Sequence, residues 1–150
     1  DALFRLGFGM YDAYMQERVA GTDSWQEEIR RYLSGYMAFA LENPELYQLC
    51  FERPVPGFVP SPESLELSQQ ILQRGYDGVG RWREHMNSTL SNRQIADLVI
   101  AMMHGLTALH MANEPGLPVG EGRFGGLIAA AVALFDAAWS TPVTSQGEKP

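Results

Sequence analysis

Apolar side chains recur every three or four residues along most of the chain, which is the spacing of one face of a helix. Alternation of the kind that marks a half-buried strand is almost absent. We therefore expect an all-α fold, an antiparallel bundle of about six helices. Capping residues, glycines and prolines place these helices at residues 2–20, 25–42, 44–52, 62–87, 92–113 and 122–139.

Short polar motifs predict where the helices begin and end. Ser24, Ser61 and Ser91 each precede an apolar run and are expected to be N-caps, with capping boxes at Ser24 and Ser91. Gly21 is expected to end the first helix. Asn43 is expected to cap the third helix, with Pro44 at its first position, where no backbone donor is needed. Prolines between residues 53 and 60 exclude regular structure there.

The segment from residue 32 to residue 51 is unusually rich in aromatic side chains and methionine. Its bulky apolar residues cover more than one helical face, which favours a helix that lines a chamber over one that lies on a surface. The next long helix contains Gly75, Gly78 and Gly80, each of which costs about 1 kcal/mol relative to alanine. We expect a kink or a close approach there.

The last two expected helices have more apolar surface than one core can cover. A helix that is apolar all round is buried on every side or lies in a membrane, and the last helix is shorter than the roughly 20 residues of a membrane span. We favour a homodimer in which both helices pair with a second copy as a four-helix bundle. The alternative is the centre of a larger monomeric bundle. The expected interface residues are Leu98, Met102, Leu109, Phe124, Leu127, Ile128, Ala131 and Phe135.

Composition limits the possible functions. The 150 residues suit one domain, which we place at residues 1–140, followed by a polar tail at 141–150 that we expect to be disordered. A net charge of −7 argues against contact with a phosphate backbone by this segment alone. The single cysteine, Cys50, favours a reducing compartment, and no signal peptide is visible. The abrupt helical start without methionine suggests a fragment.

Catalytic and metal motifs are not recognisable in the sequence. His104 and His110 are six residues apart and do not share a helical face, and no paired-cysteine or acidic-loop spacing occurs. We therefore expect no metal site, no cofactor and no enzymatic activity. His104 is either a core histidine or a hydrogen-bonding group in a pocket. Cys50 has apolar neighbours, which favours an inert buried thiol. Most acidic residues, Glu28 among them, are expected on polar faces and near helix ends.

The remaining signal is a surplus of tyrosine, tryptophan and methionine. Any one of these residues is more often plain core, but buried tyrosine hydroxyls need partners and flexible methionines let a cavity adapt to different ligands. A largely apolar chamber with a few polar groups is typical of a small-molecule site. The candidate ligand-binding residues are Tyr11, Tyr14, Met15, Tyr32, Tyr36, Met37, Tyr76, Trp82, Met86, Met103 and His104.

Three segments together resemble the C-terminal domain of TetR-family transcriptional regulators. They are RRYLSGYMAFALENPELYQLCFERP at residues 30–54, MMHGLTALHMANEPG at residues 102–116, and the apolar last helix. The His104-Gly105 pair is similar to the subgroup with a Trp/His-Gly signature, although Met103 stands where tryptophan is common. The resemblance covers nearly the whole chain through Trp139.

The resemblance implies a ligand-sensing and dimerising domain of a bacterial, cytoplasmic regulator, with a repressor favoured. Helices one, two, four and five would enclose a small hydrophobic or aromatic effector. Operator DNA would be contacted only through a separate N-terminal helix-turn-helix domain, absent from this sequence, and residues 46–51 would lie near it. No membrane partner is expected. The alternatives are a helical carrier or enzyme that uses the same pocket, and a pure dimerisation module with a filled core.

Overall fold

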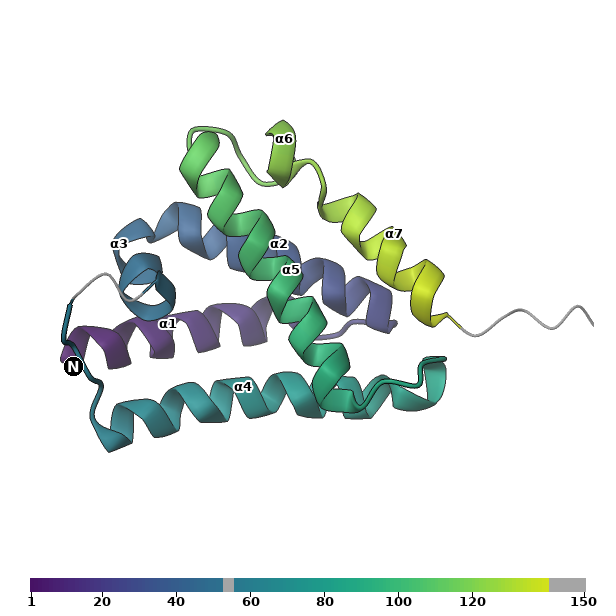
Figure 1. Ribbon diagram of the computed structural model, residues 1–150, viewed down its shortest axis with the longest axis horizontal. Coiled ribbons are helices and arrows are strands. Elements are labelled where there is room, and N and C mark those ends of the chain that lie inside the picture. The colour runs from purple at the N-terminus through teal and green to yellow at the C-terminus, as the bar shows by residue number, and fades with distance from the viewer. Residues whose placement is uncertain (53–55, 141–150) are drawn as a thin grey trace, which may run out of the picture.

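The computed structural model describes residues 1–52 and 56–140, and within them the chain is helical (Figure 1). Predictions for the prolines at 53–55 and for the tail at 141–150 lie outside the described residues. Within residues 1–52 and 56–140, the one β-type pairing is an isolated bridge between Met86 and Ser140. The α-helices are α1 (Ala2–Val19), α2 (Trp25–Glu42), α3 (Pro44–Tyr47), α4 (Pro62–Trp82), α5 (Asn92–Asn113), α6 (Gly122–Gly125) and α7 (Ile128–Trp139). A π-helix, η1 (Gln48–Glu52), follows α3, and a 3₁₀-helix, η2 (Arg83–His85), follows α4.

The serine caps form as the sequence predicts. The hydroxyl oxygens of Ser24, Ser61 and Ser91 accept from the backbone N–H three residues on. Only Ser91 has the complete capping box, with Gln94 accepting from the Ser91 backbone N–H at 3.0 Å. At Ser24 the box is half formed, because the Glu27 carboxylate instead accepts from Arg30 and Arg31.

One predicted cap and two predicted helix extents are wrong. Asn43 does not cap α3 with its side chain; its amide donates to the Phe39 carbonyl and satisfies an acceptor at the end of α2. The α-helix α4 ends at Trp82 and not near residue 87. The last helix is broken between Gly125 and Ile128. Gly126 ends its first turn, where an added Cβ would lie 2.6 Å from the Gly122 carbonyl oxygen.

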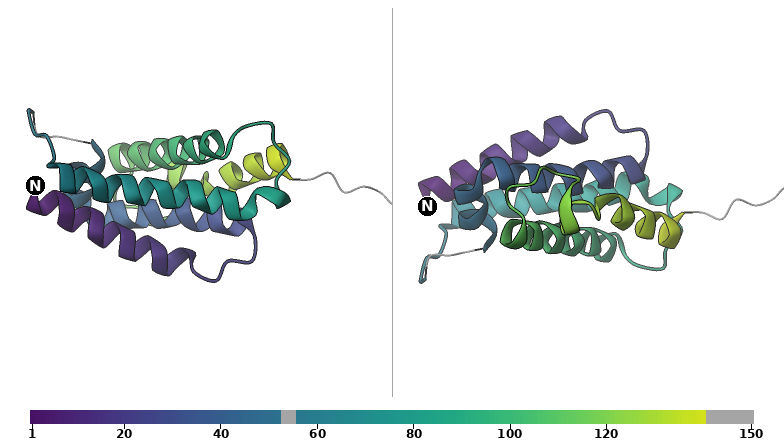
Figure 2. Two further views of the ribbon diagram at one scale, coloured as in Figure 1. Left: turned by 90° about the horizontal axis from the view of Figure 1, so that it is seen from below. Right: turned by 90° about the horizontal axis from the view of Figure 1, so that it is seen from above.

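The other helices pack around α2 in the centre. In Figure 1, α1 and α4 lie below α2 and α6 and α7 lie above it, while α5 crosses from the end of α4 to α6 and contacts both α2 and α4. Figure 2 shows the same helices from below and from above. Consecutive α1 and α2 run in opposite directions, whereas the neighbours α1 and α4 both begin at the left of Figure 1. The centre of α2 is the most deeply buried part of the chain, with Tyr36, Met37 and Ala40 fully inaccessible.

The short segment α3–η1 packs across the N-terminal half of α1. Gly7 makes this approach possible, because an added Cβ would lie 2.5 Å from the Sγ atom of Cys50. The Cys50 thiol is buried and donates to the Phe4 carbonyl, 3.7 Å away. Burial raises the pKa of this thiol to about 11, which keeps it neutral near pH 7. These contacts fix the position of the next residue, Phe51.

Candidate functional site

A cavity of about 210 Å³ lies among α1, α2, α4 and α5. Its lining is mostly apolar and aromatic, with a few polar groups, which is the usual composition of a small-molecule site. The four helices are those that the resemblance to TetR regulators implied. Phe51 of η1 and Met86 after η2 complete the lining.

Seven of the predicted ligand-binding residues line this cavity. They come from four helices and one loop, far apart in sequence. They are Tyr11, Met15, Tyr32, Trp82, Met86, Met103 and His104. Their contact with a ligand stays a prediction.

The other four predicted residues lie elsewhere, which corrects their assignment to the cavity wall. Tyr14 donates to Glu42 at 3.0 Å and carries the Arg18 guanidinium over its ring. The Tyr76 hydroxyl donates to Asp97 across the outside of α4 and α5. Tyr36 is fully buried behind the lining. Met37 is buried on the side of α2 that faces α6. A Cβ added to Gly125 of α6 would lie 3.5 Å from the Met37 sulfur.

Glu28 is the most important residue that the sequence reading placed wrongly. It is 6% exposed and lines the cavity, although it was expected on a polar surface. Its carboxylate accepts from the Arg81 guanidinium at 2.9 Å and from the Trp82 indole N–H. An added Cβ on Gly78 would lie 3.4 Å from this carboxylate, so the glycine gives the group room. The close approach expected from the glycines of α4 is therefore seen at Gly78, and the helix remains continuous.

Two tyrosine hydroxyls near the cavity have no hydrogen-bond partner among the described residues. These are the hydroxyls of Tyr11 and Tyr32, and burial raises the pKa of both. Nearby, Asp12 forms an ion pair with Arg74, and both residues belong to the lining. The polar groups of the cavity wall thus include the buried Glu28 carboxylate with its partners, the Asp12–Arg74 ion pair, these two phenols, the His104 ring, and the side chains of Gln16 and Ser68.

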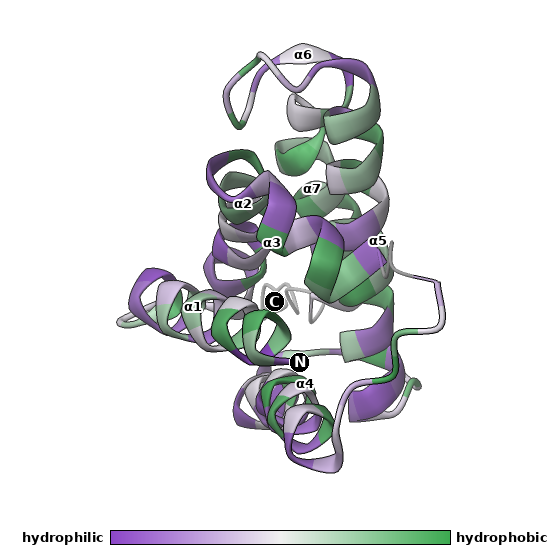
Figure 3. Ribbon diagram, turned by 90° about the vertical axis from the view of Figure 1, so that its left-hand side faces the viewer, coloured by the Kyte–Doolittle hydropathy of each residue, from purple (hydrophilic) through white to green (hydrophobic). Residues whose placement is uncertain are grey.

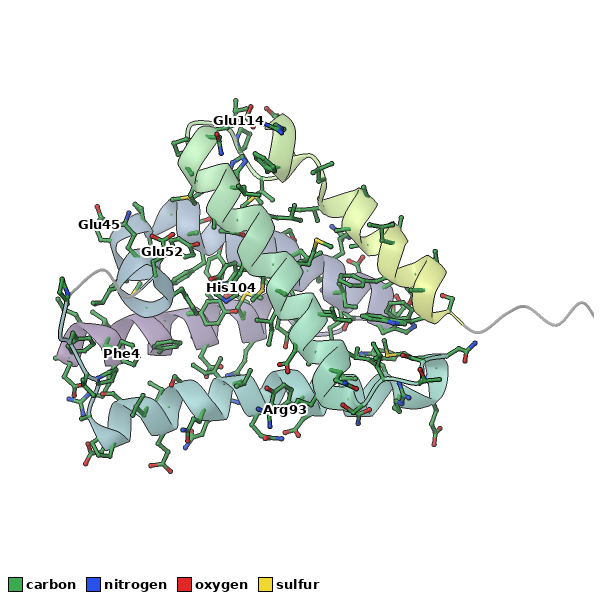
Figure 4. All side chains as sticks on the ribbon, in the orientation of Figure 1. Phe4, Glu45, Glu52, Arg93, His104 and Glu114 are labelled. Carbon is green, nitrogen blue, oxygen red and sulfur yellow. The ribbon has the colours of Figure 1, made fainter. Side chains whose placement is uncertain are left out.

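His104 connects the cavity to the aromatic centre of the fold. Figure 4 shows it pointing inward from α5, while Glu45 and Glu114 lie at the periphery. Burial lowers the pKa of His104, so the ring is neutral near pH 7. Tyr36 Oη lies 2.8 Å from His104 Nδ1, and with the phenol as donor the ring proton is on Nε2. The His104 ring also contacts Phe51, with centroids 5.7 Å apart.

Phe51 is the centre of an aromatic cluster that joins the cavity to α1 and α3. Its ring centroid lies 5.1 Å from those of Tyr11 and Tyr36 and 5.9 Å from that of Tyr47. Because Phe51 belongs to a π-helix, a rare geometry that is common at functional sites, its placement depends on an irregular backbone. A change in the cavity that moved Phe51 would therefore also displace the side chains that it contacts in α1 and α3.

The last two helices present a second apolar surface, directed away from the core. We call it the outer face and define it by Leu98, Ala101, Gly105 and Leu109 of α5, by Leu127 just before α7, and by Ala130 and Leu134 of α7, all of them exposed. Hydrophobic colours extend over α5 and α7 in Figure 3. Leu134 is 64% exposed and Leu98 47%.

The predicted interface residues divide between this outer face and the core. Leu98, Leu109 and Leu127 are exposed, and Met102 and Phe124 are half-buried. Ile128, Ala131 and Phe135 are buried within the same chain, in the stripe that α7 packs against α2. Assigning these three to a partner was therefore wrong.

Two stretches, Asn92–Asn113 and Gly122–Trp139, are long and apolar enough to meet the length and composition of a membrane span. Both are also core helices of this fold, with buried side chains at regular spacing. The second is interrupted, and the 12 residues of α7 are about 18 Å long, less than the roughly 30 Å of a bilayer core. Among the described residues, no group of three or more histidine, cysteine or acidic side chains could hold a metal ion.

The fold and its cavity define an all-α domain with a partly open, mostly apolar chamber among its helices. The model of the tetracyclin repressor-like C-terminal domain family matches residues 29–124, nearly two thirds of the chain. The chain belongs to this family, which confirms the resemblance at that level.

One solved structure, described as that of a protein with unknown function from Rhodococcus sp. RHA1, has the same fold. The TM-score is 0.77 over 94% of this chain and 73% of that one, with 20% sequence identity. At this identity the likeness concerns the fold alone. A comparison with curated proteins finds no match.

Proposed function

We propose that this domain senses a small hydrophobic or aromatic effector in the cavity and dimerises through the outer face. In this proposal it is the regulatory part of a bacterial, cytoplasmic transcriptional repressor. DNA is contacted by a separate N-terminal helix-turn-helix domain. The observation that carries the proposal is the apolar cavity, whose wall includes side chains from α1, α2, η1, α4 and α5.

The proposal assigns transmission of the signal to Phe51 and its neighbours. An effector beside His104 and Tyr11 would press on the aromatic cluster that holds η1 against α1. A shift of α1 and α3 would then change the spacing of two DNA-binding domains in a dimer. Half-sites are about one helical turn apart, so a small change in spacing lowers the affinity for DNA.

Gly75 offers a test, because it lines the cavity and an added Cβ would meet nothing within 4 Å. Gly75→Phe places a bulky ring at this point of the wall and is expected to fill part of the chamber and to weaken binding of toluene at least tenfold by isothermal titration calorimetry, roughly 1.4 kcal/mol. Gly75→Ala is the matched control. It should bind toluene as the wild type does and be more stable by about 0.5–1 kcal/mol.

The same pair of variants separates a regulator from a carrier. In the full-length protein with its DNA-binding domain, the effect of toluene on affinity for a DNA fragment from upstream of its gene is measured by fluorescence anisotropy. We expect Gly75→Phe to abolish this effect and Gly75→Ala to keep it. Toluene binding with no effect on DNA affinity would favour the carrier, and unchanged toluene binding in Gly75→Phe would contradict the assigned cavity.

A further inference from the structure

We propose that the cavity selects small organic ammonium ions with a single ring or a short branched chain, and that Glu28 is the residue that selects them. This inference rests on the proposed function of the cavity as a ligand chamber. The charge that carries it is the Glu28 carboxylate in the cavity wall. Buried carboxylates are rare unless they are paired, and the side chain of Glu28 is 7% exposed in a mostly apolar wall.

The counter-ion of Glu28 lies on the solvent side, outside the cavity wall. Its counter-ion, Arg81, is 60% exposed and, in the described part of the chain, is not among the residues that line the cavity. Arg81 bonds to Oε1, and the Trp82 indole N–H bonds to Oε2. A carboxylate can accept about four hydrogen bonds, so each oxygen keeps acceptor capacity. Arg81 is on the solvent side of this ion pair, whereas Glu28 itself belongs to the cavity wall.

Aromatic side chains surround this carboxylate. Trp25, Glu28 and Tyr32 follow one another at spacings of three and four residues on one face of α2, and all three line the cavity. The Trp82 ring completes the group from α4. Aromatic rings attract cations through their negative faces, and cages of such rings recognise quaternary ammonium groups. A buried carboxylate among three aromatic rings favours an ammonium ion over a neutral or anionic ligand.

The other charges of the wall support the same choice. Asp12 and Arg74 neutralise each other, and neutral His104 adds no positive charge. Glu28 is the charged residue of the lining whose counter-ion, Arg81, lies outside it, so the wall offers an anionic ligand no unpaired cation.

The volume limits the size of the ligand. A dry apolar cavity of about 150 Å³ in another protein holds benzene. At about 210 Å³, this cavity has room for one substituted ring.

The test compares two probes of nearly equal shape, benzyltrimethylammonium and its uncharged analogue neopentylbenzene. Affinities are measured by isothermal titration calorimetry on the wild type, Glu28→Gln and Arg81→Gln. Glu28→Gln keeps the size of the side chain and an oxygen that accepts from Trp82, but removes the charge. It should weaken binding of the cation roughly tenfold, the scale of a desolvated cation–aromatic and ionic contact, and leave neopentylbenzene unchanged.

Arg81→Gln should have the opposite effect. Removing the exposed counter-ion leaves the Glu28 charge less compensated, so the cation should bind about threefold or more tightly, with neopentylbenzene again unchanged. If Glu28 and Arg81 only brace α2 against α4, both variants should weaken both probes. Because Arg81 is exposed, its variant can be measured even if Glu28→Gln does not fold.

The outcomes separate this inference from the function it rests on. Binding of neopentylbenzene without binding of the cation would overturn the choice of an ammonium ion and leave the ligand chamber standing. Equal loss of both probes in Glu28→Gln, or weaker cation binding in Arg81→Gln, would also overturn it. Binding of neither probe to the wild type would contradict the ammonium site and the chamber together.

Discussion

Replacement of Leu134 with glutamate is expected to convert the domain from a dimer to a monomer. Leu134 is 64% exposed and belongs to the outer face. In the proposed dimer it is buried against the partner, and an unpaired carboxylate there would cost several kcal/mol. The isolated fold should be unaffected, because surface substitutions usually change stability by about 0.5 kcal/mol or less. Light scattering after size-exclusion chromatography measures the change.

A matched control lies on the opposite side of the molecule. Leu3 in α1 is 62% exposed, almost the same as Leu134, but it is not part of the outer face. Leu3→Glu should therefore leave the dimer of this domain intact. A wild type that is monomeric at micromolar concentration would contradict the proposed interface, and so would dissociation by Leu3→Glu with a dimeric Leu134→Glu.

Replacement of Gly7 with alanine is expected to destabilise the domain by about 1–3 kcal/mol, the usual cost of an overpacked core. The new methyl group would lie 2.5 Å from Cys50 Sγ and 3.5 Å from a methyl carbon of Leu46, so the Cys50 side chain or η1 itself must shift. The gain in helix propensity of up to about 1 kcal/mol opposes this cost and does not cancel it. Urea denaturation gives the free energy of unfolding.

Two further variants isolate the contact. Gly9 is in the same helix and has nothing within 4 Å of an added Cβ, so Gly9→Ala should stabilise the domain by about 0.5–1 kcal/mol. Cys50→Ala removes the sulfur, and combined with Gly7→Ala it should recover most of the loss. Equal stability of Gly7→Ala and Gly9→Ala would show that η1 is not held against α1 as described.

The sequence predicted the helices well because caps and prolines act locally. The capping box of Ser91 and Gln94 forms between residues three apart, and Pro44 is favourable simply because it occupies the first turn of a helix. Local rules failed where a group had two possible partners. The Asn43 amide could serve the end of α2 or the start of α3, and only the folded geometry decides.

The candidate site was less predictable because apolar pattern alone does not fix which face points inward. On α7 nearly every position is apolar, so the sequence could not separate the buried stripe of Ile128 and Phe135 from the exposed stripe of Leu127 and Leu134. Glu28 did leave a signal. It stands in register with Trp25 and Tyr32, and an acidic residue within an aromatic stripe indicates a buried carboxylate.

Methionine methyl NMR tests the central claim, that the cavity among α1, α2, α4 and α5 is a ligand chamber. The seven methionines divide into two groups. Met15, Met86 and Met103 line the cavity, whereas Met10, Met37, Met102 and Met111 do not. With methyl-labelled protein and toluene, intermolecular nuclear Overhauser effects are expected to the first three alone. Effects confined to the other four, or none at saturating toluene, would contradict the claim.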